Sequence, residues 1–265
     1  MVKQNSSPTY TRKKLTTRCQ CTPSCTNNPL DNSSFCKKHI KFCPRLSPLS
    51  GYEPTFNPDY YNRLKGVKES HNCFAYAFNH IQMPQIKSCT KNSCSIPFHQ
   101  PGRASGYPKW SKINGKRCPD ILARLFGDVK GLKFGTFDKK CPPKTSKIAL
   151  VTDENEDYHF YRQDSNGYWS HKPGGTSVTH LDATQRPIYD PQYASRKYTD
   201  SGLDYDNFCG YMCTPRTQQH HFKRGGKQRG GKQRSRKRSS RKQSSRKQHN
   251  RKRKAYNKTR KNLFS

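Results

Sequence analysis

Within residues 70–81, Cys73 begins an apolar run that contains two alanines. The run predicts a buried helix from Cys73 to about Gln82. Either Ser70 or Asn72 can cap its start. A cysteine in the first helical turn lies beside unpaired backbone N–H groups and the positive end of the helix dipole, which favour the nucleophilic thiolate. Cys73 is therefore a candidate nucleophile, and the alternative is a buried structural cysteine that behaves as a small hydrophobe.

Two histidines fall on a predicted hairpin in the second half of the chain. Residues 158–163 and 167–172 alternate aromatic and polar side chains, and the turn-forming residues 164–167 lie between them. His159 is then on the first strand and His171 on the second. A histidine on each strand can supply a base for a nucleophile and a group that orients the base.

The length of the hairpin loop decides whether the two histidines share a face of the sheet. Directly opposed residues of an antiparallel pair have a constant sum of residue numbers. A two-residue turn at 166–167 would place His159 and His171 on opposite faces. A three-residue loop at 165–167 pairs Tyr161 with His171 and places His159 diagonally from it on the same face. Glycine at position 167 fits a type I turn followed by a left-handed residue, so we predict the three-residue loop. We then expect the helix with Cys73 to pack on the face that carries both histidines and to approach His159 from there.

The elements around these residues follow the order helix, helix and sheet. A second, amphipathic helix is predicted over residues 118–127, with proline at its first position. An apolar, β-prone run at 146–152 precedes the hairpin. Helices followed by an antiparallel sheet indicate the α+β class.

A cysteine at a helix start, a histidine on a following strand and a polar residue on the next strand resemble the papain-like fold. The motif at residues 72–77 looks most like the circularly rearranged branch, which includes NlpC-type cell-wall peptidases and cysteine-histidine-dependent amidohydrolases. The resemblance spans about residues 70–180. It implies Cys73 as nucleophile, His159 as general base and His171 as the orienting residue. Asp157 and Asp182 are the alternatives for the orienting group.

The same resemblance implies a thiol peptidase or amidase that acts on a peptide or amide substrate. The backbone N–H groups of Asn72 and Cys73, at the helix start, would hold the oxyanion. The family commonly has Asp where this chain has Asn72, and smaller aliphatic residues where this chain has Phe160 and Tyr161. The wider stretch from His159 to about residue 211 is also similar to uncharacterised proteins of giant DNA viruses. We therefore expect a viral cysteine hydrolase, or else a non-enzymatic virion or DNA-packaging protein that keeps the fold.

A dense group of metal-ligating residues precedes this domain. Five cysteines and one histidine fall within 25 residues, and the segment has few apolar residues to form a core. One tetrahedral zinc ion could supply its folding energy, because thiolate and imidazole ligands suit zinc. We predict a structural zinc site with the ligands Cys21, Cys25, Cys36 and His39, with Cys19 able to replace Cys21 and Cys43 as a spare; reduced or adventitiously oxidised surface cysteines are the alternative.

The charge of the chain is concentrated at its carboxyl end. Lys and Arg number 52 against 17 acidic residues, which gives a net charge of +35. Residues 218–265 hold 20 of the basic residues and no acidic one, so +15 remains for residues 1–217. This composition predicts a disordered tail that binds the phosphates of nucleic acid, or another polyanion. The candidate contacts are Arg234, Arg236, Lys237, Arg238, Arg241, Lys242, Arg246, Lys247, Arg251, Lys252, Arg253 and Lys254.

Composition also sets the expected domains and location. We predict a flexible arm at 1–17, a zinc module at 18–44, the papain-like domain at 52–216 and the tail at 217–265. No apolar run of about 18 residues occurs, which excludes a membrane span, and the first residues lack the apolar segment of a secretory signal. We therefore expect the protein in a virion or the host cytoplasm, with the nucleus as an option. In a reducing compartment we expect the cysteines to serve metal binding or catalysis more often than disulfides.

Overall fold

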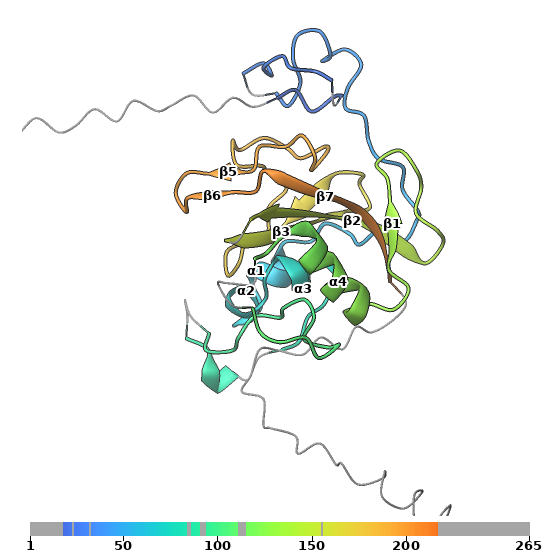
Figure 1. The fold of residues 1–265 in the computed structure, drawn as a ribbon. Coiled ribbons are helices and arrows are strands. Elements are labelled where there is room, and N and C mark those ends of the chain that lie inside the picture. Colours follow the sequence, from blue (N-terminus) through green and yellow to red (C-terminus); the bar gives the residue numbers. More distant parts are fainter. Residues whose placement is uncertain are drawn as a thin grey trace, which may run out of the picture. The chain divides into compact units, whose positions relative to one another are not determined.

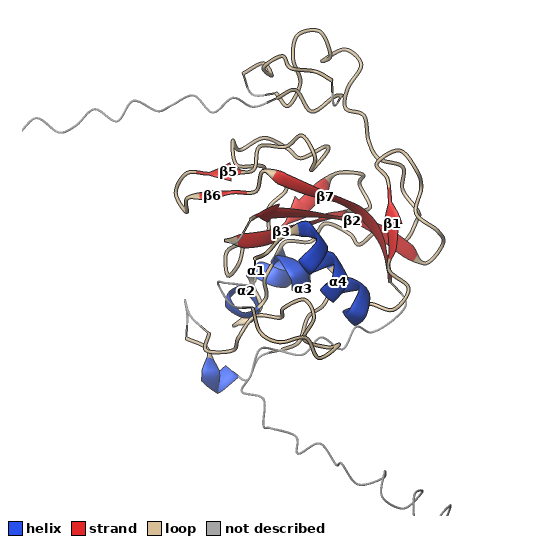
Figure 2. Cartoon of the chain, in the orientation of Figure 1, coloured by secondary structure: helices blue, strands red, loops and turns tan. Residues whose placement is uncertain are grey.

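The computed structural model describes residues 18–216 except 23, 32, 84–85, 91–93, 111–114 and 155. The predicted arm at 1–17 and tail at 217–265 lie outside the described residues. The described part combines short helices with an antiparallel sheet, so the α+β class is confirmed (Figures 1 and 2). The elements are α1 (Asp59–Asn62), α2 (Val67–Ser70), α3 (Cys73–Ala77), the 3-10 helix η1 (Ile86–Ser88), α4 (Cys118–Asp128), β1 (Lys133–Gly135), β2 (Thr145–Asp153), β3 (Asp157–Gln163), β4 (Trp169–His171), β5 (Lys197–Tyr198), β6 (Leu203–Asp204) and β7 (Asn207–Pro215).

The main sheet has five strands in the order β1-β7-β2-β3-β4. Its neighbouring strands are antiparallel, and β2 lies between β7 and β3. The side chains of β2 alternate between two apolar clusters, because successive residues of a strand point to opposite faces. Ile148 and Leu150 pack with residues of α3 and α4 on one face, whereas Ala149 and Val151 face the loops that lead to β7. Helices thus cover one face of the sheet and loops with the β5–β6 pair cover the other (Figure 1).

The register of the β3–β4 hairpin is the predicted one. Tyr161 pairs with His171, and the backbone N–H of Asp164 donates to the carbonyl of Tyr168 at 2.9 Å. Gly167 has a φ of +88°, which is the left-handed region that favours glycine. The three-residue loop is therefore confirmed, and His159 and His171 lie on the same face.

One predicted helix end is wrong, and one strand was not predicted. The helix from Cys73 ends at Ala77 and does not reach Gln82, because the chain turns at Asn79, whose φ is +53°. Residues 207–215 form β7, a strand that was not predicted. This strand pairs with both β1 and β2, and its aromatic Tyr211 and apolar Met212 face opposite sides of the sheet.

Eight of the twelve cysteines form disulfides, contrary to the expectation of a reducing location with free thiols. Two of the disulfides connect distant segments of the sheet domain. One joins the start of α4 to β7 and closes a separation of 91 residues, and the other joins the loop before β2 to β7 over 72 residues. Such long-range links restrict the unfolded chain. The pairs are Cys21–Cys43, Cys89–Cys94, Cys118–Cys209 and Cys141–Cys213.

A buried arginine holds the carboxyl end of α3. The Arg162 guanidinium donates to the carbonyl of Tyr76 at 3.3 Å and to the side chain of Asn79 at 3.1 Å. It also lies 3.8 Å above the Tyr76 ring and forms a buried ion pair with Asp164 at 2.9 Å. A cation near the last carbonyls of a helix satisfies acceptors that have no partner within the helix. Arg162 therefore fixes the short helix against β3.

We expect Arg162→Met to lower the free energy of unfolding by about 3–5 kcal/mol, because it leaves the Asp164 carboxylate buried without its partner. Urea unfolding followed by circular dichroism measures the change. The control is Arg63→Met, which removes an exposed ion pair with Asp59 and should change stability little. Equal effects of the two substitutions would contradict a structural role of the buried pair.

Candidate functional site

Asn72 caps the helix that carries Cys73. The Oδ1 atom of Asn72 accepts from the backbone N–H of Ala75 at 3.2 Å, and its Nδ2 donates to the carbonyl of His99 at 2.9 Å. Cys73 follows as the first residue of α3, with its Sγ 3.9 Å from the carbonyl oxygen of Tyr158 on β3. The cap thereby fixes the start of the helix and places the thiol against the first residues of β3.

His159 and His171 are joined by a buried hydrogen bond. The Nε2 of His159 and the Nδ1 of His171 are 2.7 Å apart, and the Nε2 of His171 lies 2.9 Å from the carbonyl oxygen of Leu181. Because a carbonyl can only accept, the His171 proton is assigned to Nε2, and its Nδ1 then accepts from the Nε2–H of His159. This tautomer leaves Nδ1 as the basic nitrogen of His159.

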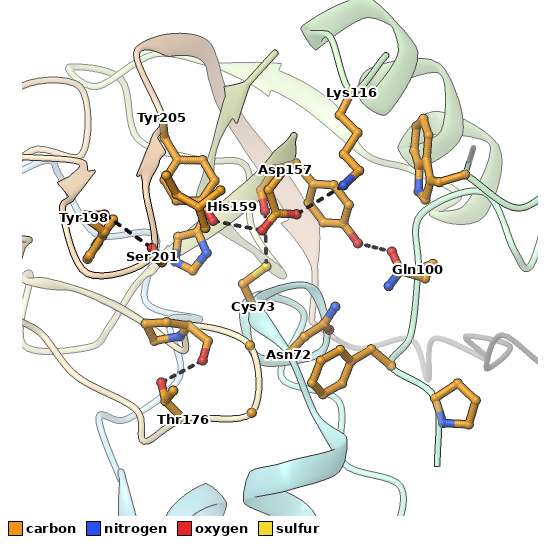
Figure 3. A pocket seen from close by; sticks show the side chains of 18 of the residues that line it. Asn72, Cys73, Gln100, Lys116, Asp157, His159, Thr176, Tyr198, Ser201 and Tyr205 are labelled. Carbon is orange, nitrogen blue, oxygen red and sulfur yellow. Dashed lines mark hydrogen bonds and ion pairs between the residues drawn. The ribbon is translucent and has the colours of Figure 1, made fainter. Parts of the chain in front are cut away.

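The helix with Cys73 packs on the opposite face of the sheet from the one we expected. Cys73 belongs to the apolar cluster of Tyr158 and Phe160, whereas the His159 ring lies 5.4 Å from that of Tyr205 on the other face. Successive residues of a strand point to opposite faces of the sheet. Tyr158 and Phe160 face the helix and pack with it, so His159, which lies between them in the chain, points to the other face. Cys73 and His159 nevertheless line one cavity at the start of β3 (Figure 3).

This cavity has a volume of about 600 Å³. Asp157 lies in it, with one carboxylate oxygen accepting from the Tyr205 hydroxyl at 2.9 Å and the other 3.8 Å from the Lys116 ammonium group (Figure 3). Aromatic and glycine residues form much of the remaining wall. This volume is within the range of ligand-binding cavities in proteins.

Burial controls the charges of the three candidate catalytic groups. Burial and the nearby charge of Asp157 raise the pKa of the Cys73 thiol to about 12. Burial and the neighbouring His171 hold the pKa of His159 well below its usual value, and burial lowers the pKa of His171 to about 4. All three groups are therefore neutral at pH 7 in the free protein. His159 would take the thiol proton during an attack, because no thiolate is formed in advance.

This electrostatic state predicts the pH dependence of alkylation. We expect the rate at which chloroacetamide modifies Cys73 in the His159→Ala protein to rise roughly tenfold per pH unit between about pH 6 and pH 9. Without the base only the thiolate reacts, and the thiolate fraction rises tenfold per unit below the thiol pKa. Peptide mapping by mass spectrometry separates Cys73 from the other cysteines. A rate that stays constant over this range in His159→Ala would contradict the raised pKa of the Cys73 thiol and indicate a preformed thiolate.

The structure also places the two alternative orienting carboxylates. Asp157 lies in the cavity but pairs with Tyr205 and Lys116. Asp182 accepts from the backbone N–H groups of Thr184 and Ser195, at 2.8 and 3.0 Å. The hydrogen-bond partner of His159 Nε2 is His171.

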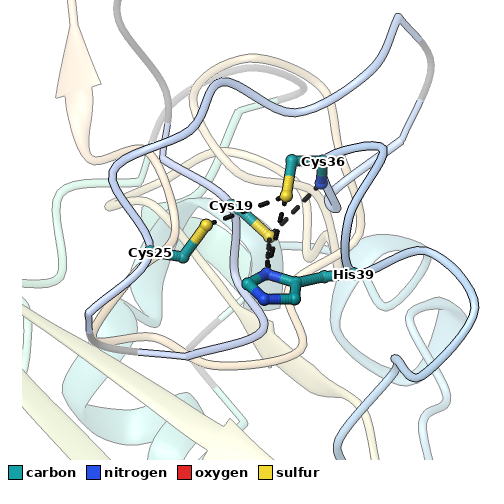
Figure 4. Close-up of side chains that lie close together, drawn as sticks. All are labelled: Cys19, Cys25, Cys36 and His39. Carbon is teal, nitrogen blue, oxygen red and sulfur yellow. Dashed lines mark hydrogen bonds between the residues drawn. The ribbon is translucent and has the colours of Figure 1, made fainter.

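A second group of reactive side chains lies in the segment before the sheet domain. The donor atoms of Cys19, Cys25, Cys36 and His39 all lie within 4.8 Å of one another (Figure 4). The choice of Cys21 as a ligand is wrong, because Cys21 forms a disulfide with the expected spare, Cys43. Cys19 takes its place, and the other three predicted residues belong to the cluster.

Three of the six distances between donor atoms in the cluster match a tetrahedral zinc site. The Sγ atoms of Cys25 and Cys36 are 3.7 Å apart, and the Nδ1 of His39 lies 3.4 Å from the Sγ of Cys19 and 3.5 Å from that of Cys36. Zinc bonds of about 2.3 Å to sulfur and about 2.0 Å to nitrogen give tetrahedron edges of roughly 3.5–3.8 Å. All three cysteines are buried, and they are free of disulfides. The described residues therefore include a buried three-cysteine, one-histidine cluster that could hold a metal ion.

Comparison with known proteins identifies the family. The chain is 35% identical over 157 residues to insoluble matrix shell protein 1 of Ruditapes philippinarum, and the match covers 59% of this chain and 87% of the shell protein. This chain belongs to the insoluble matrix shell protein 1 family. No protein-family model matches the chain, and no solved structure matches it.

The remaining expectations concern membranes and the tail. Within residues 18–216, apart from the gaps named above, no helix is long and apolar enough to cross a membrane. The twelve candidate polyanion contacts between Arg234 and Lys254 lie outside the described residues. Three groups of the site carry no recognisable sequence signal, because each reaches the site from a segment without a motif. They are Tyr205, Lys116 and the Leu181 carbonyl.

Proposed function

We propose that this member of the shell protein family hydrolyses amide bonds with a papain-type site made of Cys73, His159 and His171. The observation that carries the proposal is the hydrogen-bonded chain from His159 through His171 to the Leu181 carbonyl. It directs the basic nitrogen of His159 away from His171, and the same histidine lines one cavity with Cys73. A thiol and a base at one cavity, with a second group that orients the base, are the parts that acyl transfer requires.

The proposed reaction has two steps. In the first, the Cys73 sulfur bonds to the acyl carbon while Nδ1 of His159 takes the thiol proton. The imidazolium that forms keeps its Nε2–H bond to His171, and it then protonates the leaving amine as the C–N bond breaks. In the second, His159 removes a proton from water, whose oxygen attacks the thioester, and Cys73 regains its proton as the carboxylic acid leaves. The backbone N–H groups of Asn72 and Cys73 at the start of α3 are the candidate oxyanion donors.

Digestion of a degenerate peptide library tests this function. We expect the full chain to generate new peptide amino termini that mass spectrometry detects and that the Cys73→Ala protein does not generate. The intact cap and α3 of the variant are checked by circular dichroism. Equal cleavage by both proteins would assign the activity to a contaminant, and cleavage by neither would overturn the peptidase proposal.

The proposed cofactor is one structural zinc ion held by Cys19, Cys25, Cys36 and His39. The four donors form a closed set, so the ion would order the segment and would take no part in hydrolysis. A papain-like fold of the NlpC type stays part of the proposal. It is supported by a nucleophile on α3, a base on β3 and an orienting residue on β4.

A second candidate is a non-enzymatic role in a matrix or a virion. The shell protein relative supports it, and the four disulfides favour an oxidising location such as an extracellular matrix or a virion surface over the host cytoplasm. In this role the basic tail would bind nucleic acid or another polyanion. Deletion after Arg216 should then weaken the salt dependence of binding to duplex DNA, and an unchanged salt dependence would refute a role of the tail.

A further inference from the structure

Gln20 connects the metal-ligand cluster to the sheet domain. Its neighbours in the chain are the cluster residue Cys19 and the disulfide-bonded Cys21, and its side chain is 4% exposed. The Nε2 of Gln20 donates to the Asp182 carboxylate at 3.3 Å, and its Oε1 accepts from the backbone N–H of Tyr189 at 3.0 Å. Gln20 thus joins the segment of the cluster to both ends of the loop at residues 181–189.

The same loop provides the surroundings of His171. The carbonyl of Leu181, the residue before Asp182, accepts the hydrogen bond from His171 Nε2 at 2.9 Å. The carbonyl of Ile188, the residue before Tyr189, accepts from the backbone N–H of Trp169 on β4 at 3.0 Å. Each contact of Gln20 is therefore one residue away from a contact that the loop makes with β4.

The carboxylate of Asp182 organises this loop internally. It accepts from the backbone N–H groups of Thr184 at 2.8 Å, Arg186 at 3.1 Å and Ser195 at 3.0 Å. Asp182 is 2% exposed, so these bonds are protected from water. A buried carboxylate with several donors fixes the backbone around it, including the adjacent carbonyl of Leu181.

We propose that Gln20 and Asp182 are positioning residues that make the orientation of His171 depend on occupancy of the metal-ligand cluster. The inference rests on the proposed zinc site and, for its consequence on hydrolysis, on the proposed catalytic function. A segment with so small an apolar core is ordered by its metal, so removal of the ion releases Gln20 from the loop. The Leu181 carbonyl then loses its fixed position, and with it the tautomer of His171 that accepts from His159.

The coupling is tested by a signal that does not depend on catalysis. In protein labelled with nitrogen-15, the Nε2–H of His171 exchanges slowly with water because it is buried and bound to the Leu181 carbonyl. We expect Gln20→Leu to accelerate this exchange roughly 5–150-fold, the range of typical coupling between sites, while one zinc ion stays bound per chain. Chelation of zinc from the unmodified protein should accelerate it at least as much.

Ser34→Ala is the matched control. Ser34 joins the same segment to the same loop, through a 2.9 Å hydrogen bond to the carbonyl of Pro187, but it does not contact Asp182. We expect the exchange rate in this variant to stay within about twofold of the unmodified protein. Asp182→Asn leaves all four metal ligands in place, and we expect it to accelerate the exchange as Gln20→Leu does. This second variant tests the coupling even if Gln20→Leu loses zinc.

The outcomes separate the coupling from the hydrolase proposal. Unchanged exchange in zinc-loaded Gln20→Leu and Asp182→Asn would overturn the coupling, whether or not the protein hydrolyses amides. Faster exchange in both variants and in the Cys73→Ala background would establish the coupling even if no substrate is found. If hydrolysis occurs, both variants should lower kcat more than they raise KM, because they disturb the base and leave the lining of the cavity in place.

Discussion

His159→Ala is expected to slow hydrolysis of p-nitrophenyl acetate at Cys73 by about 10²–10⁴-fold, the usual contribution of a positioned general base. With its pKa raised to about 12, the Cys73 thiol has almost no thiolate at pH 7 and depends on a base to remove its proton. Stopped-flow release of p-nitrophenol measures acylation, and the steady-state rate measures deacylation. His180→Ala, which removes an exposed histidine, is the control and should change neither rate by more than about twofold.

His171 should act through His159. His171→Leu removes the acceptor at 2.7 Å from His159 Nε2, and we expect a loss of roughly 10–100-fold because a misdirected base loses its alignment. His171→Gln keeps an acceptor and should recover part of that loss. If His171→Leu and His171→Gln are equally impaired, His171 contributes packing alone. If neither affects the rate, the orienting role is wrong.

Loss of zinc is the second large effect that we expect. Cys36→Ser should abolish stoichiometric zinc binding, since a closed structural zinc site contributes roughly 10–16 kcal/mol of apparent binding free energy and depends on all its ligands. Metal analysis of protein purified without chelator gives the zinc content, and tryptic cleavage near residues 18–44 reports the order of the segment. We expect one zinc per chain in the unmodified protein.

The disulfide between Cys21 and Cys43 supplies the matched control. The double variant Cys21→Ser, Cys43→Ser should retain one zinc per chain, because the cluster consists of Cys19, Cys25, Cys36 and His39. If Cys36→Ser retains zinc, the ligand set is wrong. The set is also wrong if the double variant loses zinc while Cys19→Ser retains it. No zinc in the unmodified protein would remove the site altogether.

Local rules were sufficient for the hairpin and for the helix start. Gly167 can adopt a positive φ without strain, and this one residue decided the loop length and placed both histidines on one face. Asn72 was one of two predicted caps, and its side chain accepts from the N–H three residues later, as a cap does. In both cases the determining contact lies within a few residues of the chain.

Features that depend on distant contacts could not be read from the sequence. Spacing alone could not separate Cys19 from Cys21 as a ligand, because the choice depends on the disulfide partner of Cys21, which is 22 residues away. Residues 207–215 have a glycine and two cysteines in a short run, and they form a strand because β1 and β2 pair with them from both sides. The face covered by α3 was missed for the same reason, since it depends on where Tyr158 and Phe160 find apolar partners.

The most direct test of a Cys73 nucleophile is the site of acylation. The full chain is mixed with p-nitrophenyl acetate, quenched in acid within seconds and digested, and the thioester-bearing peptide is identified by mass spectrometry. We predict a single acetyl group on Cys73 that disappears over time in the unmodified protein and persists in His159→Ala, because deacylation also needs the base. Acetylation spread over Cys19, Cys25 and Cys36 with none on Cys73 would contradict the account.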